Sequence, residues 1–182
     1  MHVPTRRTLA LMIAVLVSPV VPAIAAQTRH GASRPAPTSS DKPKPIGKYE
    51  DWTAATHDEA GQTVCYAFTR ASNSSPKQPG RGEVVLTVTQ RPGGRDAVAI
   101  SAGFPYAPGA EVSTQVEQAA LSFYTSGTSA FAREGSTAVA AFRRGRQVVA
   151  RSPAPHGRYV IDSFSLRGFD QAYDAINRAC PR

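Results

Sequence analysis

The stretch 159-YVIDSFSLRGFDQAYDAINRACPR-182 predicts a strand followed by an amphipathic helix, and the helix ends beside a cysteine. One stripe of this helix is apolar, with members spaced i, i+3, i+4 and i+7: Phe169, Ala172, Tyr173 and Ile176. Asp170 in the first turn and Arg178 in the last turn both complement the helix dipole, and Pro181 ends the helix. Such a helix must lay its stripe against the rest of the domain, so this segment closes the core.

The start of the chain predicts a secretory signal peptide over residues 1–25. Paired arginines precede an unbroken apolar run, Leu9–Val17, and Ala23-Ile24-Ala25 supplies the small residues that a signal peptidase reads. A membrane anchor is the alternative, but a spanning helix needs about 20 apolar residues without proline breaks. We therefore expect an exported chain without a transmembrane span, located in the periplasm or associated with the outer envelope. Sec and twin-arginine export both stay open.

Residues 26–46 predict a flexible, basic, proline-rich tether. This stretch holds four prolines and four Lys or Arg, and Ile46 is its only large aliphatic residue. An arm that binds an anionic surface is the alternative to a plain spacer.

Residues 47–182 then form one domain. The domain holds 15 basic and 12 acidic residues, whereas the whole chain carries a net charge of +8. Because the domain itself is only mildly basic and the chain is exported, we expect no nucleic-acid partner.

Cys65 is the only possible partner of Cys180. In an exported protein an even pair of cysteines usually forms a disulfide, which here would join the C-terminal helix to an early strand. Two free thiols or a redox pair are the alternatives, but the chain contains no C-x-x-C motif. We expect a structural disulfide.

The domain is predicted to be mainly β. Alternating and β-branched segments bounded by Gly and Pro turns predict strands at 49–56, 63–70, 83–90, 96–104, 112–117, 121–125, 129–132, 148–151 and 158–164. The alanine-rich segment Ser136–Arg144 predicts a short internal helix with Gly145 as its C-cap. Strands at this spacing favour a β-sandwich or barrel. Trp52, on the first strand, is interpreted as core packing, with ligand stacking as the alternative.

Several short motifs resemble the invasion-associated locus B family of small exported alphaproteobacterial envelope proteins. They are Asp51-Trp52-Thr53, Val64-Cys65-Tyr66, Phe131-Ala132 and a terminal set, Phe164, Ser165, Leu166, Gly168, Phe169, Ala172, Tyr173 and Cys180. The resemblance covers residues 47–181 and implies an immunoglobulin-like β-sandwich with appended helices in the periplasm or envelope. The motif residues are expected to be structural. The resemblance also implies a link to host interaction.

No pattern in the chain predicts catalysis, a metal site or a cofactor. His57 and His156 are the only histidines of the domain, and neither has Cys, His or Asp at a ligand spacing. The chain has no G-x-S-x-G, no P-loop and no dinucleotide fingerprint. We expect a protein that is not an enzyme.

Five arginines between Glu134 and Asp162 have no acidic residue among them: Arg143, Arg144, Arg146, Arg151 and Arg158. Arginine binds phosphate and carboxylate through two parallel hydrogen bonds, so these residues are a candidate face for an anionic surface or a partner. A solvated basic surface is the alternative. The hypothesis is an exported, non-enzymatic envelope protein that binds an unidentified envelope protein or anionic envelope component. An enzyme with a site assembled from scattered residues, or a purely structural component, are the other possibilities.

Overall fold

The computed structural model describes residues 42–182. The predicted signal peptide and residues 26–41 of the predicted tether lie outside the described residues. The tether boundary changes, because Lys44, Pro45 and Ile46 belong to the first strand, β1 (Lys44–Tyr49), which pairs with the next strand. A bulge between Pro45 and Gly47 interrupts the register of β1, and an edge strand tolerates proline because one side of it has no partner.

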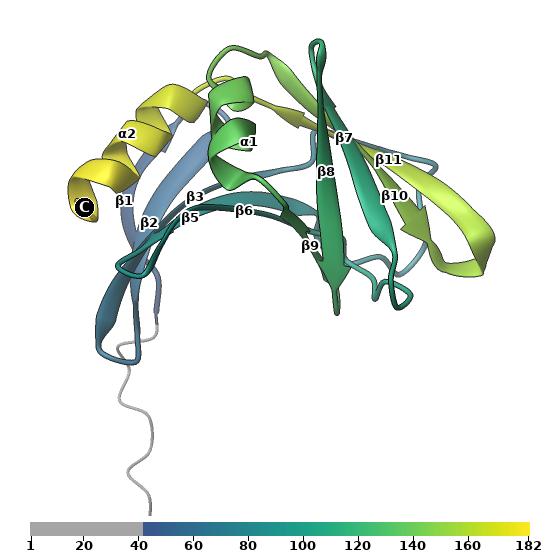
Figure 1. Cartoon of the computed structure of the whole chain (residues 1–182), viewed down its shortest axis with the longest axis horizontal. Coiled ribbons are helices and arrows are strands. Elements are labelled where there is room, and N and C mark those ends of the chain that lie inside the picture. The colour runs from purple at the N-terminus through teal and green to yellow at the C-terminus, as the bar shows by residue number, and fades with distance from the viewer. Residues whose placement is uncertain (1–41) are drawn as a thin grey trace, which may run out of the picture. The chain divides into compact units, whose positions relative to one another are not determined.

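Within residues 42–182, eleven antiparallel strands form one sheet in the order β1-β2-β3-β5-β6-β9-β8-β7-β10-β11-β4 (Figure 1). The remaining strands are β2 (Trp52–Glu59), β3 (Gln62–Arg70), β4 (Asn73–Ser75), β5 (Val85–Arg91), β6 (Gly94–Ser101), β7 (Glu111–Val116), β8 (Ala119–Ser126), β9 (Ser129–Ala132), β10 (Gln147–Ala154) and β11 (Arg158–Ser165). The helices are α1 (Gly135–Phe142) and α2 (Phe169–Ala179), and a 3-10 turn covers Pro155–Gly157. The predicted mainly-β fold with a short internal helix and a C-terminal amphipathic helix is confirmed.

The sheet differs from two separate sandwich layers in being continuous. Pairing of β6 with β9 joins its two halves, and β4, which follows β3 along the chain, pairs with β11 in the other half. A sheet of this size curls because each strand is rotated against its neighbour. One core cluster therefore contains residues of both halves, such as Leu86 and Ile100 from the first and Phe123 and Phe164 from the second.

Two sequence predictions of local structure are wrong. The segment predicted as one strand at 49–56 contains the turn between β1 and β2, where Glu50 has φ 51°. The predicted helix C-cap is also wrong, because α1 ends at Phe142 and its C-cap is Arg143. Gly145 instead allows close packing, since a Cβ atom there would lie 2.4 Å from Val116 Cγ1.

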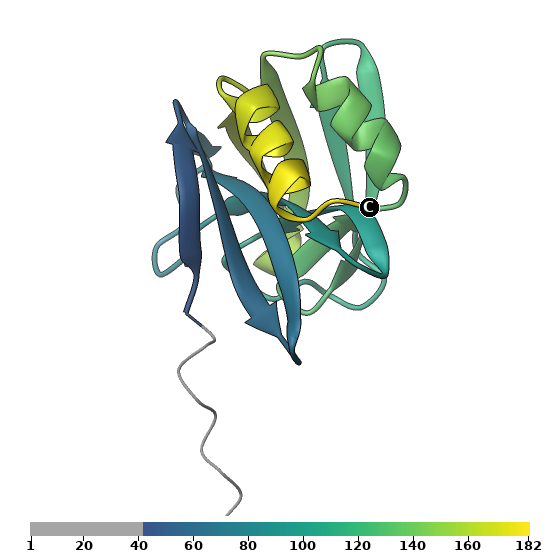
Figure 2. The ribbon, with the colours of Figure 1, turned by 90° about the vertical axis from the view of Figure 1, so that its left-hand side faces the viewer.

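Helix α2 packs its predicted stripe on the first strands of the sheet. Phe169, Ala172 and Ile176 are buried, and α2 contacts β1, β2 and β3. Figure 2 shows α1 and α2 on the same side of the molecule. Full burial of a Phe or Ile side chain stabilises the fold by about 1.5–3 kcal/mol, so Phe169 and Ile176 alone account for several kcal/mol of α2 docking.

Gly168 sets the angle at which α2 leaves β11. It has φ 85°, and a Cβ atom there would lie 2.0 Å from the carbonyl oxygen of Tyr49. The backbone of the β11–α2 turn thus approaches the β1–β2 turn, where the Asp51 amide donates to the Arg167 carbonyl at 3.3 Å. Only glycine fits both the conformation and the close approach.

We predict that Gly168→Ala lowers the free energy of unfolding by roughly 1–3 kcal/mol or more, because it adds a steric clash to an unfavourable backbone conformation. Gly127→Ala is the matched control, since Gly127 has φ 58° but nothing within 4 Å of its added Cβ. Urea denaturation of both variants separates the clash from the conformational strain. Equal losses for the two variants would contradict this role of Gly168.

Candidate functional site

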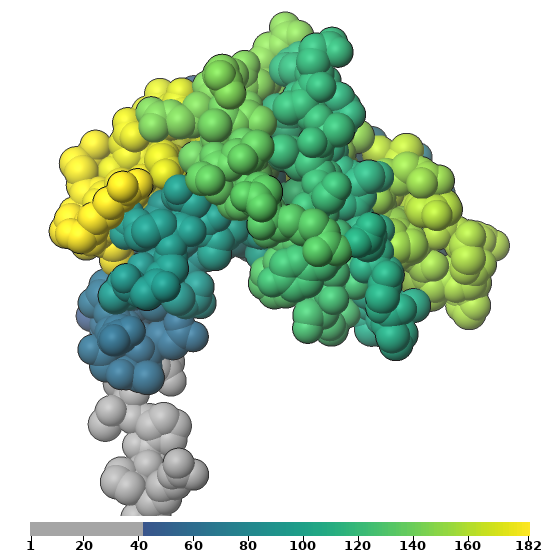
Figure 3. Space-filling view, in the orientation of Figure 1, coloured from purple at the N-terminus to yellow at the C-terminus, as the bar shows by residue number. Residues whose placement is uncertain are grey.

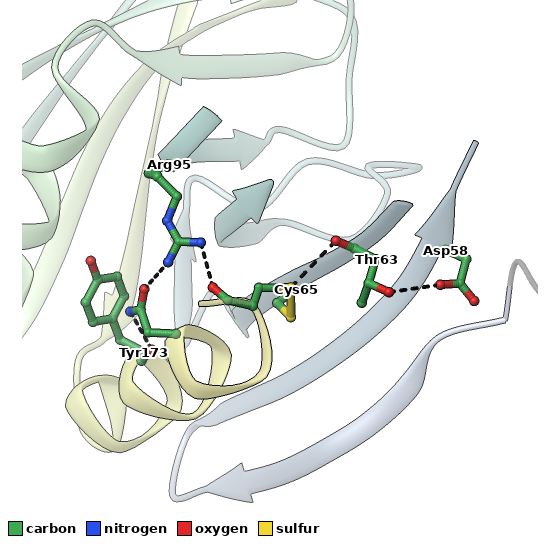
Figure 4. Close-up of a disulfide and its surroundings, with 7 residues drawn as sticks. Asp58, Thr63, Cys65, Arg95 and Tyr173 are labelled. Carbon is green, nitrogen blue, oxygen red and sulfur yellow. Dashed lines mark hydrogen bonds between the residues drawn. A yellow bond between two sulfur atoms is a disulfide. The ribbon is translucent and has the colours of Figure 1, made fainter. Parts of the chain in front are cut away.

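The predicted disulfide between Cys65 and Cys180 is present, with the two Cα atoms 5.9 Å apart. Cys65 lies on β3 and is fully buried, and Cys180 caps the C-terminus of α2. Arg95 of β6 donates to the carbonyl oxygen of Cys180 at 2.6 Å and to Asn177 Oδ1, as Figure 4 shows. The disulfide and the guanidinium together fix the end of α2, which is a structural role.

A polar cluster ties the middle of α2 to the β5–β6 hairpin. The Tyr173 hydroxyl donates to Asp96 Oδ1 at 2.7 Å, and Gln90 Nε2 donates to the same oxygen at 2.6 Å. Burial raises the pKa of Tyr173, and its hydrogen bond to Asp96 raises that pKa further. The phenol therefore stays protonated at neutral pH and serves as a donor, not as a base.

Trp52 and the residues of the terminal family motif gather where β2, β11 and α2 meet. Trp52 is fully buried, and its Nε1 donates to the carbonyl oxygen of Ser165 at 2.9 Å. Its ring meets that of Phe169 edge-on, with centroids 4.8 Å apart. Asp51 accepts a hydrogen bond from Thr69 through its backbone carbonyl at 2.7 Å. These contacts are packing and backbone contacts of the domain itself.

Three of the five arginines of the predicted face lie between the end of α1 and the start of β10. Arg143 forms ion pairs with Asp170 at 3.0 Å and Asp174 at 3.5 Å, so it joins α1 to α2. Arg146 lies 3.5 Å from Glu117. Arg144 donates to the carbonyl oxygen of Ala140. The acidic partners come from other parts of the sequence and neutralise two of these three charges.

The side chains of the other two arginines, Arg151 and Arg158, lie on opposite sides of the β10–β11 hairpin. Arg151 is opposite Ile161 on the outer side, where both are exposed, whereas Arg158 is opposite the buried Ala154. The five arginines therefore do not all lie on one face of the domain. In the described part of the chain, neither Arg151 nor Arg158 has a carboxylate within 4.0 Å.

The outer side of the hairpin carries a mixed apolar and basic surface, Arg151, Tyr159 and Ile161, which we call the hairpin patch. The Arg151 guanidinium lies 3.4 Å from the centroid of the Tyr159 ring. Tyr159 is 48% exposed and Ile161 is 43% exposed. These are two of the four large hydrophobic side chains that are at least 36% exposed within residues 42–182, so the patch is an unusual part of the surface.

Sequence reasoning missed a buried ion pair between Arg81 and Asp162, whose side chains are 6% and 0% exposed. Two parallel hydrogen bonds of 2.8 and 2.7 Å join them. Ser74 donates to Asp162 Oδ1 at 2.6 Å, and Arg81 Nε donates to the carbonyl oxygen of Ala102 at 2.6 Å. One signal was available, because Asp162 occupies an inward position in the alternation of β11 between the buried Val160 and Phe164.

The role of this ion pair is structural. Arg81 uses Nε and both terminal nitrogens within the protein, and both oxygens of Asp162 accept from it. Both side chains are at most 6% exposed, so the pair lies away from the surface that a substrate would reach. The pair instead ties the loop after β4 to β11, and so connects the two halves of the sheet.

The two histidines do not form a catalytic arrangement. His57 is half-buried and meets the Tyr66 ring edge-on, with centroids 5.4 Å apart. His156 is exposed in the 3-10 turn. Neither lines any of five surface depressions of about 260 to 400 Å³. Among residues 42–182, no group of three or more His, Cys, Asp or Glu could hold a metal ion, and no helix could span a membrane.

The family model described as "Invasion associated locus B (IalB) protein" matches residues 52–177. The chain belongs to this family. Its structure resembles the crystal structure of invasion associated protein B from Bartonella henselae, with a TM-score of 0.52 and 18% sequence identity. The match covers 73% of this chain and 95% of the Bartonella chain. No protein with a curated description matches. The invasion associated locus B fold predicted from the motifs is thus confirmed.

Replacing Cys180 by Ser should lower the free energy of unfolding by roughly 2–5 kcal/mol, because a long loop in the unfolded chain is then released. Thermal melting with and without reductant measures this loss, and reductant should destabilise the wild type alone. If both wild-type thiols react with an alkylating agent in the native, unreduced protein, the disulfide assignment is wrong.

We predict that Asp162→Asn destabilises the domain by roughly 3–5 kcal/mol, because it leaves the buried Arg81 guanidinium without a counter-charge. The double variant Arg81→Met with Asp162→Leu should recover part of this loss, since it removes both charges. Chemical denaturation of the two variants tests the assignment. A neutral effect of Asp162→Asn would show that the ion pair is solvated in solution.

Proposed function

We propose that this domain is an exported, non-enzymatic binding module of the cell envelope, and that it docks on an anionic envelope surface through the hairpin patch. Family membership suggests an invasion-associated envelope protein. The signal-peptide pattern at the start of the chain and the disulfide support export, because disulfides persist in oxidising compartments. The description of the family names a locus and no reaction.

The single observation that carries the proposal is the chemistry of the hairpin patch. Arg151 has no carboxylate partner among the described residues and is held by the Tyr159 ring, so its guanidinium is already oriented. A guanidinium binds phosphate oxygens through two parallel donors. Tyrosine and isoleucine side chains suit the boundary between polar headgroups and acyl chains. The patch therefore combines the two interactions that an anionic lipid surface offers.

The charges around the patch support the same partner. The only carboxylate of the β10–β11 hairpin, Asp162, is buried against Arg81 on the other side of the sheet. Arg158 is exposed beside the turn, on the other side of the hairpin from Arg151, and adds a positive charge to the hairpin end. An anionic surface meets no exposed acidic side chain along this hairpin, so approach costs little electrostatic energy.

Vesicle binding tests the proposal. Wild-type protein should co-sediment with vesicles of phosphatidylglycerol and phosphatidylcholine, and not with phosphatidylcholine alone. Arg151→Gln should weaken this binding about fivefold, because one basic residue near an anionic surface contributes about 1 kcal/mol. Arg146→Gln removes the same charge from a side chain that is 91% exposed and paired with Glu117, and should change binding little.

Two results would contradict the proposal. Equal losses for Arg151→Gln and Arg146→Gln would mean that net charge alone attracts the protein to vesicles. Absence of vesicle binding, together with an acidic envelope protein that crosslinks to wild type and not to Arg151→Gln, would assign the hairpin patch to a protein partner instead. Deleting residues 26–41 is the control for a contribution of the basic segment before the domain.

A further inference from the structure

The turn of the β10–β11 hairpin carries a histidine next to the hairpin patch. The two strands are paired up to Ala154 and Arg158, and the 3-10 turn Pro155–Gly157 joins them. Every residue from Pro155 to Arg158 is exposed, and we call these four residues the hairpin tip. Figure 3 shows the hairpin, in yellow-green, projecting at the right-hand end of the domain. A surface that meets the hairpin therefore meets its tip as well.

The side chain of His156 is not occupied by the fold. Its backbone has φ 64° and ψ 30°, and Gly157 after it has φ 70°, so the two residues turn the chain. Within residues 42–182, the His156 imidazole has no carboxylate within 4.0 Å and no aromatic ring packed on it. His57 differs, because it is half-buried against the Tyr66 ring. The His156 ring is thus open to water.

The exposed charges of the hairpin all have the same sign. Residues 147–165 contain five ionisable side chains: Arg151, His156, Arg158, Tyr159 and Asp162. The Asp162 side chain is 0% exposed and is paired with Arg81. While His156 is neutral, the hairpin therefore exposes two positive charges, Arg151 and Arg158, and proton uptake by His156 adds a third.

The elements next to the hairpin hold no free acid that would offset this third charge. Strand β7 starts at Glu111, whose carboxylate is already paired with Arg133 at 2.5 Å. The loop of residues 102–110 shares a small core cluster with the hairpin and has one ionisable residue, Tyr106. Burial raises the pKa of Tyr106, so this phenol stays neutral in neutral or acidic solution. Strand β4 has no ionisable residue, and Lys77 after it is basic.

We infer that His156 is a pH-dependent contact of the hairpin, so that the domain attaches to an anionic surface more tightly as the pH falls. Histidine is the side chain that ordinarily changes its charge between about pH 5 and pH 8. His156 precedes Tyr159 of the hairpin patch by three residues, which span at most about 10 Å. Salt screens charges over a similar distance of about 8–10 Å, so a surface in contact with Tyr159 attracts a charged His156. This inference rests on the proposed docking through the hairpin patch and adds its regulation.

Binding and protonation of His156 must favour each other. An anionic surface stabilises the charged imidazolium, so attachment near neutral pH should take up protons from the buffer. Arg151 and Arg158 cannot cause this uptake, because a guanidinium stays protonated throughout the range. Calorimetry of vesicle binding in two buffers with different ionisation enthalpies measures the uptake. It should be present in wild type and strongly reduced in His156→Asn.

Co-sedimentation with vesicles at about pH 7.5 and about pH 5.5 tests the inference on the chain from residue 26. Vesicles of phosphatidylglycerol and phosphatidylcholine suit this test, because their phosphodiesters stay ionised at both pH values. Wild type should bind roughly fivefold more tightly at the lower pH, the gain from one added positive charge. His156→Asn tolerates the left-handed backbone and cannot gain a proton, so it should lose this gain. His156→Arg should bind at both pH values as wild type does at the lower one.

His57→Gln and His30→Gln are the matched controls, and both should keep the pH dependence of wild type. Thermal melting at the two pH values checks that each variant is folded. Equal wild-type affinity at both pH values would overturn the inference and leave the proposed docking intact. If His156→Asn keeps the full pH dependence, the proton binds elsewhere and the inference is wrong. Absence of vesicle binding at either pH would overturn the docking and the inference together.

Discussion

The contact between Phe169 and the rings around it is the interaction on which the rest of the domain depends. Phe169 meets Trp52 of β2 at 4.8 Å and Phe142 of α1 at 5.5 Å, both edge-on. One side chain thus joins the first strands, the internal helix and the C-terminal helix, and edge-on aromatic pairs add about 0.5–1.5 kcal/mol each beyond their burial. The glycine turn before Phe169 and the disulfide at Cys180 hold α2 at its two ends.

The buried pair of Arg81 and Asp162 performs the corresponding role at the far side of the sheet. Apolar residues of similar volume would often give equal or greater stability than a buried ion pair. The pair instead determines an orientation, because its two parallel hydrogen bonds hold the loop after β4 in one position against β11. A short strand of three residues such as β4 has little packing of its own, and this polar contact determines where it lies.

The sequence predicted those features that depend on local periodicity. The pattern of residues 63–70 predicted a strand that the structure contains as β3, and the helical stripe correctly placed α2. It did not predict the turn at Glu50, since glutamate rarely adopts a positive φ and no Gly or Asn marks the position. Nor did it predict the fate of the five arginines, because the acids that neutralise Arg143 and Arg146 come from α2 and the β7–β8 turn, which only the fold brings close.

The same dependence on the fold explains why the outer side of the sheet has two regions of different charge. Core packing, the disulfide and the buried ion pair all lie on the inward side of the sheet. The side chains at outward positions of the strands are therefore not needed for these contacts. On the outer side of β3, β5 and β9, Arg70, Arg91 and Arg133 are each paired with a glutamate. On the β10–β11 hairpin the only carboxylate is turned inward to Arg81, which leaves Arg151 unpaired on the outer side. One buried aspartate therefore both holds the loop after β4 against β11 and leaves the outer side of the hairpin positively charged.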